Sequence, residues 1–224
     1  MSTNASDSAL LKSERVYATL KRRIRDLELP PGTLLKKDEL TAELGVSWAP
    51  IGQAIARLTS DGLVDVFPQH GSFVAAIRES DVREAIFIRA ALEIEAWRQA
   101  AIGRTPELIE QLDASIARQR EALAANDLAT FYELDEALHE AIFGCIGQMR
   151  ALRLLDGVRA QLDRVRRQSL PRHGRAEATL CEHIRLVEAV RLGDPEFAVA
   201  AIRAHLGAVE KAIEAAFFAG ERAP

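Results

Sequence analysis

The sequence predicts a mainly α-helical protein with two domains: three helices with a β-hairpin, followed by an antiparallel six-helix bundle. Apolar residues recur at helical spacing along most of the 224-residue chain. One short segment, residues 63–74, instead carries two apolar runs about a turn, which is the pattern of a hairpin. Beyond residue 80 we find only helical patterns, separated by turn-forming residues.

Three helices are predicted ahead of the hairpin. The first ends before Pro30, because proline lacks the amide hydrogen that a helix needs and clashes with the preceding turn. A second, over residues 37–44, ends at Gly45, a residue type that favours the left-handed conformation of a helix C-cap. Ser47 is placed to N-cap a third helix that ends near Gly62. The apolar stripes of the first and third helices consist of Val16, Leu20, Ile24, Leu27, Ile51, Ile55 and Leu58.

Three helices followed by a hairpin make a winged helix-turn-helix. In this fold the third helix enters the major groove of DNA, and the hairpin lies along the backbone or the minor groove. We assign the domain to residues 11–76 and expect residues 1–10 to form a disordered tail. The alternative is a small helical domain without a nucleic-acid partner.

The second domain, residues 80–218, divides into six helices at turn-forming residues. Thr105 before Pro106, and Asp194 before Pro195, each combine an N-cap with a proline in the first helical turn. The breaks between helices lie at residues 103–106, 126–127, 144–147, 171–174 and 193–195. Such short connections favour antiparallel neighbours.

The composition is that of an ordinary globular protein. The net charge of −4 is uneven, since residues 1–78 hold 10 Lys/Arg against 9 Asp/Glu and the rest is acidic. The sequence contains no long uncharged apolar stretch and no apolar segment near its start, so we expect neither a membrane span nor a secretion signal. Cys145 and Cys181 lack the paired spacing of a zinc or redox motif, and we expect two reduced core thiols in a cytoplasmic protein.

Polar residues fall on apolar stripes of the bundle. Asp135 and His139 are four residues apart, so they lie one above the other on an otherwise apolar helix face. His183 and His205 lie on the apolar stripes of the last two helices. Burying a carboxylate and imidazoles is costly unless they are paired or bound to something.

One Asp and three His that converge inside a bundle would form a site for a divalent transition metal. Imidazole and carboxylate ligands suit Zn, Ni, Fe or Mn, and helix bundles build such sites from facing side chains. Four ligands would close a structural site, or leave positions open on an octahedral metal. The alternative, histidines that are hydrogen-bonded in the core, suits a single inward His better than it suits this set.

Arg89 lies on the inward side of the first bundle helix, near Glu93. An inward guanidinium suits a carboxylate effector through two parallel hydrogen bonds. Gln161 and Arg164 on the fourth bundle helix are further candidates for the same effector site. An ion pair between Arg89 and Glu93 explains the position of Arg89 equally well.

Two sets of motifs carry a resemblance to a known family. The first set comprises Leu29–Leu35, Glu39–Leu40, Leu44–Ser47, Pro50, Arg57–Leu58, Asp61–Val64 and His70–Val74. The second comprises Arg89, Leu92–Glu93, Asp135, His139, Glu182–His183, Gly193–Asp194 and His205–Leu206. Residues 15–75 resemble the DNA-binding domain of the GntR family, and residues 80–218 resemble the FCD effector domain of its FadR branch. With six helices rather than seven, the second domain is similar to the VanR-like subgroup.

The resemblance implies a homodimeric regulator, expected to be a repressor, that binds a double-stranded DNA operator. It also implies that Asp135, His139, His183 and His205 bind a divalent metal. A small carboxylate metabolite is then expected to dock on that metal and change the affinity for DNA.

The predicted third helix departs from the family pattern. Typical members read Ser-Arg-Thr-Pro, then an apolar residue and Arg-Glu-Ala-Leu, whereas this chain has Trp48 and Gly52 in place of two arginines that usually contact DNA. Losing one charge-assisted contact costs about 1.5–3 kcal/mol. Gln53 could read adenine, while Trp48 could pack on a thymine methyl group, on the sugar backbone or under the domain. The candidate DNA-contacting residues are Lys36, Lys37, Ser47, Trp48, Gln53, Arg57, His70 and Gly71.

Three functions compete. The leading one is a metabolite-responsive transcription factor. The second is a sensor or binding module that has lost its affinity for DNA, which the two replaced arginines favour. The third is a metal-dependent enzyme, because an Asp-His₃ metal with open positions could activate water. Against an enzyme, the sequence offers no separate inward Glu as general base, and the winged helix would be unexplained.

Overall fold

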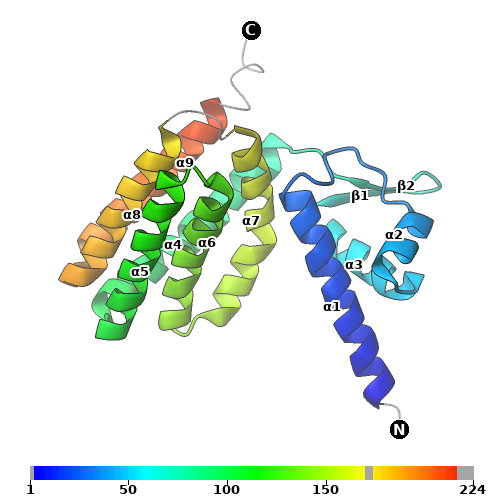
Figure 1. Cartoon of the computed structure of the whole chain (residues 1–224), viewed down its shortest axis with the longest axis horizontal. Helices are drawn as coiled ribbons and strands as arrows, with labels where there is room; N and C mark the ends of the chain where they lie inside the picture. Colours follow the sequence, from blue (N-terminus) through cyan, green and yellow to red (C-terminus); the bar gives the residue numbers. More distant parts are fainter. Residues whose placement is uncertain (1–2, 170–173, 216–224) are drawn as a thin grey trace. The chain divides into compact units, whose positions relative to one another are not determined.

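The computed structural model describes residues 3–169 and 174–215, in which the chain forms nine helices and two strands (Figure 1). The first elements are α1 Thr3–Arg25, α2 Lys37–Leu44, α3 Trp48–Ser60, β1 Val64–Phe67 and β2 Gly71–Val74. The remaining helices are α4 Glu79–Ile102, α5 Pro106–Ala124, α6 Leu128–Cys145, α7 Met149–Ser169, α8 Arg175–Leu192 and α9 Pro195–Ile213. This order confirms the predicted winged helix-turn-helix and six-helix bundle.

The chain forms two compact units. The first unit comprises Met1–Arg83 and Gly157–Arg167, and the second comprises Glu84–Asp156 and Gln168–Pro224. The helix α7 is therefore divided between the units, whereas the sequence placed all of it in the second domain. Of the predicted break at 171–174 only Gly174 is described, and the predicted domain end at 218 lies outside the described residues.

The first unit has its own apolar core. The fully buried members include Leu20, Ile24, Ile51 and Leu58, all from the predicted stripes. The strands β1 and β2 are antiparallel, with Val64 opposite Val74 and Phe67 opposite Gly71.

The first residue of β2 must be glycine. Gly71 has a φ of +114°, and a Cβ atom there would lie 2.9 Å from Cδ1 of Leu34. Residues that carry a Cβ atom rarely adopt this backbone conformation. Gly71, a candidate DNA contact, is thus also required for the shape of the hairpin.

Two local expectations in this unit are not met. The helix α1 begins at Thr3, inside the segment that we expected to be a disordered tail, and residues 1–29 contain no Gly or Pro that would stop it. Ser47 occupies the N-cap of α3, but its side chain makes no capping hydrogen bond. An N-cap oxygen often accepts from the third helical residue, and this residue is Pro50, which has no amide hydrogen.

Helix caps fix the helices of the second unit. Thr105 Oγ1 accepts from Leu108 N at 3.2 Å, and Asp194 Oδ1 accepts from Glu196 N and Phe197 N at 3.1 and 3.0 Å. Both caps were predicted. The helix α5 packs against α6 and α8, and α8 packs against α9. The inner faces of these helices therefore meet, which positions the polar residues on their stripes.

Two predictions from composition can be compared with the structure. Cys145 and Cys181 are both exposed, so the expectation of core thiols is wrong: Cys145 ends α6, and Cys181 lies on the outer side of α8. None of the described helices is long and apolar enough to cross a membrane.

Candidate metal centre and nucleic-acid interface

The four residues predicted as metal ligands converge in the second unit. The helix α6 contributes Asp135 and His139, α8 contributes His183 and α9 contributes His205, and all four are buried. Each offers one ligand atom, and these atoms all lie within 4.8 Å of one another. His183 Nε2 lies 3.1 Å from Asp135 Oδ1. We call these four residues the Asp-His₃ cluster.

A polar side chain holds the Nδ1 atom of each imidazole. Nδ1 of His139 lies 2.8 Å from Oε2 of the buried Glu93. His183 Nδ1 is hydrogen-bonded to Gln119 Oε1 at 2.7 Å, and His205 Nδ1 to Glu182 Oε2 at 2.8 Å. For His183 and His205 these oxygen atoms accept, so the proton belongs on Nδ1 and the lone pair on Nε2. The Nε2 atoms are the ones that can serve as metal ligands.

Burial keeps the imidazoles of His139 and His205 neutral. It lowers the pKa of His139 from 6.5 to about 4 against the opposing effect of Glu93. Burial likewise lowers the pKa of His205 to about 3, although Glu182 opposes the shift. Burial raises the pKa of Glu182, but hydrogen bonds from His205 and Arg175 outweigh it and bring that pKa to about 2. At neutral pH His139 and His205 are thus uncharged, the form of imidazole that binds metals.

The residues present fit a divalent transition metal. His205 Nε2 is buried and makes no hydrogen bond within the described part of the chain. An unpaired buried acceptor is costly, and a cation at this position would satisfy it. Three imidazole nitrogens and a carboxylate oxygen form a donor set suited to Zn, Ni, Fe or Mn.

Arg89 lies at the edge of the Asp-His₃ cluster. Its Nε donates to Glu93 Oε1 at 2.8 Å, and its Nη2 lies 3.4 Å from His139 Nε2. Both explanations offered by the sequence thus have a contact in the structure: the ion pair with Glu93, and a guanidinium that faces the candidate metal site.

Gln161 and Arg164 lie in the first unit and are not brought to this cluster by the described contacts. Gln161 Nε2 donates to the carbonyl of Gly62 at 2.7 Å. Arg164 is fully buried and donates to Gln161 Oε1 at 3.0 Å and to the carbonyl of Ala75. Desolvation lowers the pKa of Arg164 to about 10. Within the first unit both side chains donate hydrogen bonds to backbone carbonyl oxygens.

Sequence reasoning missed the groups that orient the imidazoles. Apart from the resemblance, Glu93 was considered only as a partner of Arg89, and Glu182 entered only through the resemblance. Gln119 was overlooked, although it continues the stripe of Leu112 and Ile116 on α5 and is fully buried. A polar residue on an apolar stripe was the available signal, and the same signal had identified the histidines.

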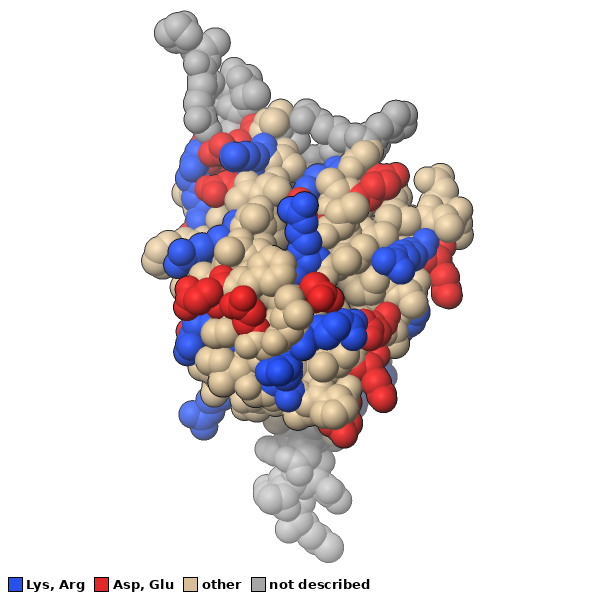
Figure 2. Space-filling model, turned by 90° about the vertical axis from the view of Figure 1, so that its left-hand side faces the viewer, with Lys and Arg blue, Asp and Glu red and all other residues tan. Residues whose placement is uncertain are grey.

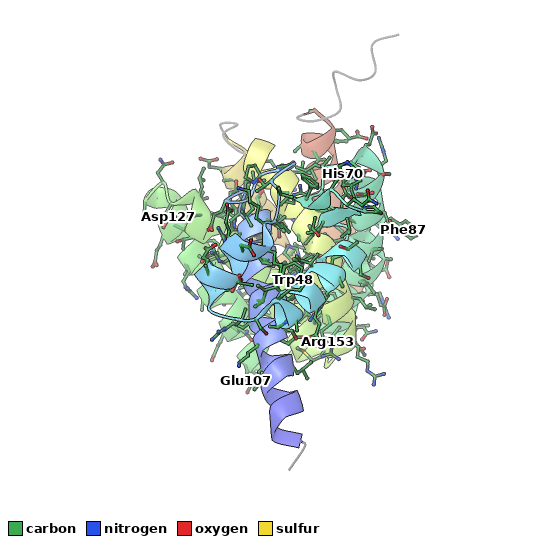
Figure 3. All side chains as sticks on the ribbon, turned by 90° about the vertical axis from the view of Figure 1, so that its right-hand side faces the viewer. Trp48, His70, Phe87, Glu107, Asp127 and Arg153 are labelled. Carbon is green, nitrogen blue, oxygen red and sulfur yellow. The ribbon has the colours of Figure 1, made fainter. Side chains whose placement is uncertain are left out.

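The other candidate site is the outer side of α3 in the first unit (Figure 3). Trp48 is 37% exposed, and Lys37 Nζ lies 5.5 Å from its ring, so the indole does not pack under the domain. Gln53 is exposed on the same side. Arg57 donates to Glu14 Oε1 at 2.6 Å and lies 3.8 Å from the centre of the Tyr17 ring.

The remaining candidate DNA contacts are exposed in the same unit. Lys36 Nζ donates to Glu39 Oε1 at 2.7 Å at the start of α2. His70, in the hairpin turn, has its Nδ1 2.9 Å from the carbonyl oxygen of Pro68. Figure 2 shows the side on which α5 and α8 lie in Figure 1, where acidic and basic side chains are interspersed, so it shows the bundle and not the surface of α3.

Comparison with known proteins identifies both parts of the chain. The family model of bacterial regulatory proteins of the gntR family matches residues 12–74, and the FCD domain model matches residues 84–208. The second match contains all four residues of the Asp-His₃ cluster.

Relatives are similar over most of their length. An uncharacterized HTH-type transcriptional regulator in an unstable DNA locus of Streptomyces ambofaciens is 34% identical over 200 residues, which cover 89% of this chain and 84% of the relative. The HTH-type transcriptional repressor RspR of Escherichia coli (strain K12) is 29% identical over 201 residues, covering 90% and 88%. Among solved structures, E. coli McbR/YncC has the same fold, with a TM-score of 0.80 at 18% identity over 91% of this chain and 97% of that chain.

Proposed function

Because the chain belongs to the GntR family of bacterial regulatory proteins and carries an FCD domain, we propose that it is a transcription factor that senses a small carboxylate at a metal in the Asp-His₃ cluster. As a member of this family it is a DNA-binding transcriptional regulator and not an enzyme. The proposal concerns the signal that it senses and the site that binds it.

The observation that carries the proposal is the convergence of four buried ligand atoms within 4.8 Å. Asp135, His139, His183 and His205 would hold a Zn, Ni, Mn or Fe ion, whose identity the donor set leaves open. When bound, the metal would supply positive charge and coordination positions for a carboxylate. Arg89 would donate to the bound carboxylate from the side of His139, since its Nη2 lies 3.4 Å from that ring.

Further parts of the proposal concern assembly and response. We infer a homodimer in the cytoplasm, because a two-fold symmetric protein matches an operator with two half-sites. We infer that the protein represses transcription, because its E. coli relative RspR is named a transcriptional repressor. On this account the DNA contacts come from the first unit and the signal from the second.

The test is DNA binding by metal-loaded protein, measured by fluorescence anisotropy on an operator selected from a random pool. Acetate, succinate and citrate are the probes, and the response is compared with that of metal-stripped protein. We expect at least one carboxylate to change the affinity only when metal is present. Equal effects with and without metal, or no effect of any carboxylate at saturating concentration, would contradict the sensing mechanism.

A second candidate function, a sensor that no longer reads DNA, is favoured by Trp48 and Gly52 at positions where arginines were expected. The selection of operators from a random pool distinguishes this candidate from the transcription factor. Sequence-specific binding that weakens with salt supports the transcription factor, whereas weak binding indifferent to sequence supports the sensor without DNA recognition.

A further inference from the structure

The outer face of α3 carries almost no charge. The helix is described in full, and its exposed or half-buried positions are Trp48, Ala49, Gly52, Gln53, Ala56, Arg57, Thr59 and Ser60. Arg57 is the one charged residue among them. Its guanidinium is bound by Glu14 and lies against the Tyr17 ring, so it is held against α1. The first two turns of α3 therefore offer an indole, small side chains and one amide.

Trp48 and Gly52 lie side by side on the outer face of α3. A Cβ atom at position 52 would lie 3.7 Å from Trp48 Nε1 and 3.8 Å from Cε2, so the indole lies beside the bare backbone of Gly52. Lys37 Nζ is 5.5 Å from the ring centre, within the range of a cation–π contact. The indole is thus positioned by neighbours and still presents part of its surface to the outside.

This surface matches one class of base pair. In the major groove, guanine is read chiefly by Arg or Lys, adenine by the amide of Asn or Gln, and the methyl group of thymine by apolar side chains. The outer face of α3 offers the second and third of these chemistries, and its only guanidinium is already paired. We propose that α3 reads A·T base pairs, with Trp48 packed on thymine methyl groups and Gln53 hydrogen-bonded to an adenine. This inference rests on DNA binding by the first unit.

The contacts to phosphate then come from elements beside α3. Lys36 and Lys37 lie at the start of α2, and Lys37 is placed next to Trp48. Phosphate contacts hold a protein in register without specifying sequence. Sequence specificity would therefore depend on uncharged residues, and its salt dependence would come from residues outside α3.

The experiment uses full-length protein and operators selected from a random pool. Within each half-site, single thymines are replaced by deoxyuridine, which removes only the methyl group. We expect A·T pairs at the positions that α3 covers, and a loss of about fourfold in affinity at the thymine under Trp48, the value for one buried methyl group. Trp48→Ala should bind thymine and deoxyuridine operators equally, while Gln53→Ala should lose about tenfold in affinity and its preference for adenine. Ser60→Ala, an exposed change at the far end of α3, is the matched control, and thermal melting checks that each variant is folded.

The outcomes separate this inference from the proposed function. Specific binding to half-sites read at guanine, or affinity unaffected by every deoxyuridine, would overturn the A·T assignment and leave a DNA-binding regulator in place. Failure to select any specific sequence would contradict the proposed function, and this inference with it.

Discussion

At the scale of single residues, the candidate metal centre depends on groups that do not themselves bind the metal. Glu93, Gln119 and Glu182 each place an oxygen atom against the Nδ1 atom of one histidine, at 2.7–2.8 Å. The hydrogen bonds to His183 and His205 set the ring tautomer and leave Nε2 of each ring free to face the rest of the Asp-His₃ cluster. Removing such an outer group typically lowers metal affinity by 10–100-fold.

Glu182 allows the clearest test of this orienting role. Glu182→Ala should lower metal affinity by about 10–100-fold, because His205 loses the acceptor of its Nδ1 proton. Glu182→Gln should stay within a few-fold of wild type, since the amide oxygen can still accept that proton. Isothermal titration with Zn²⁺ measures both, and Glu177→Ala, an exposed change on the same helix, is the control. Equal affinities for wild type and Glu182→Ala would show that the contact is structural only.

Arg89 distinguishes binding of the carboxylate from binding of the metal. Arg89→Ala should weaken carboxylate binding by roughly 10–100-fold, the loss of one charge-assisted hydrogen bond, and should change metal affinity much less. The effect on carboxylate binding is measured by titrating metal-loaded protein with the carboxylate probe that proves active. The effect on metal binding is measured by titrating metal-stripped protein with Zn²⁺. An equal loss of both affinities would mean that Arg89 acts through Glu93, with which it is ion-paired.

At the scale of elements, the caps and stripes of the helices position the candidate ligands. The helix α6 brings in Asp135 and His139 on successive turns, while α8 and α9 bring in one histidine each. These placements could be predicted because the helical period fixes which residues share a face. The ring orientations could not, because they depend on Glu93 and Gln119, whose helices α4 and α5 meet α6 and α8 only in the folded bundle.

The cap of α9 gives a prediction at this scale. Asp194→Ala removes an acceptor for two amide groups at the start of the helix that carries His205. We expect a loss of about 1 kcal/mol in the free energy of unfolding, and a melting temperature lower by about 2–4 °C, because uncapped amides at a helix start are poorly satisfied. Asp113→Ala, which breaks an exposed ion pair with Arg191, should have a smaller effect. Equal melting temperatures for the two variants would contradict a stabilising role of the cap.

At the scale of the whole molecule, the sequence predicted the order of the winged helix and the bundle, the six bundle helices and the convergence of the four residues of the Asp-His₃ cluster. It assigned Gln161 and Arg164 to the effector site because both lie on α7, but Gly157–Arg167 belongs to the first unit, where these side chains bind the carbonyls of Gly62 and Ala75. Local periodicity shows that a helix face is inward, but it does not show which unit that face packs against.

The same limit applies to the DNA-contacting face. The sequence identified Trp48 and Gly52 as departures from the family pattern, but not the arrangement that joins them. The indole lies beside Gly52 because that position has no side chain, and Lys37 reaches the ring from another helix. A contact between α2 and α3 depends on tertiary packing, which a one-dimensional pattern does not contain.

The measurement that tests the central claim most directly is the number of metal ions bound per chain. Metal-stripped protein is dialysed against excess Zn²⁺, Ni²⁺ or Mn²⁺, and bound metal is measured by mass spectrometry for wild type and His183→Ala. We predict about one ion per chain for wild type with at least one of these metals, and a large loss of bound metal in the variant. Circular dichroism and DNA binding should show that the variant is still folded and that its first unit still works. A wild type that binds none of these metals, or a variant that keeps its metal, would contradict the assignment of the Asp-His₃ cluster as the metal centre.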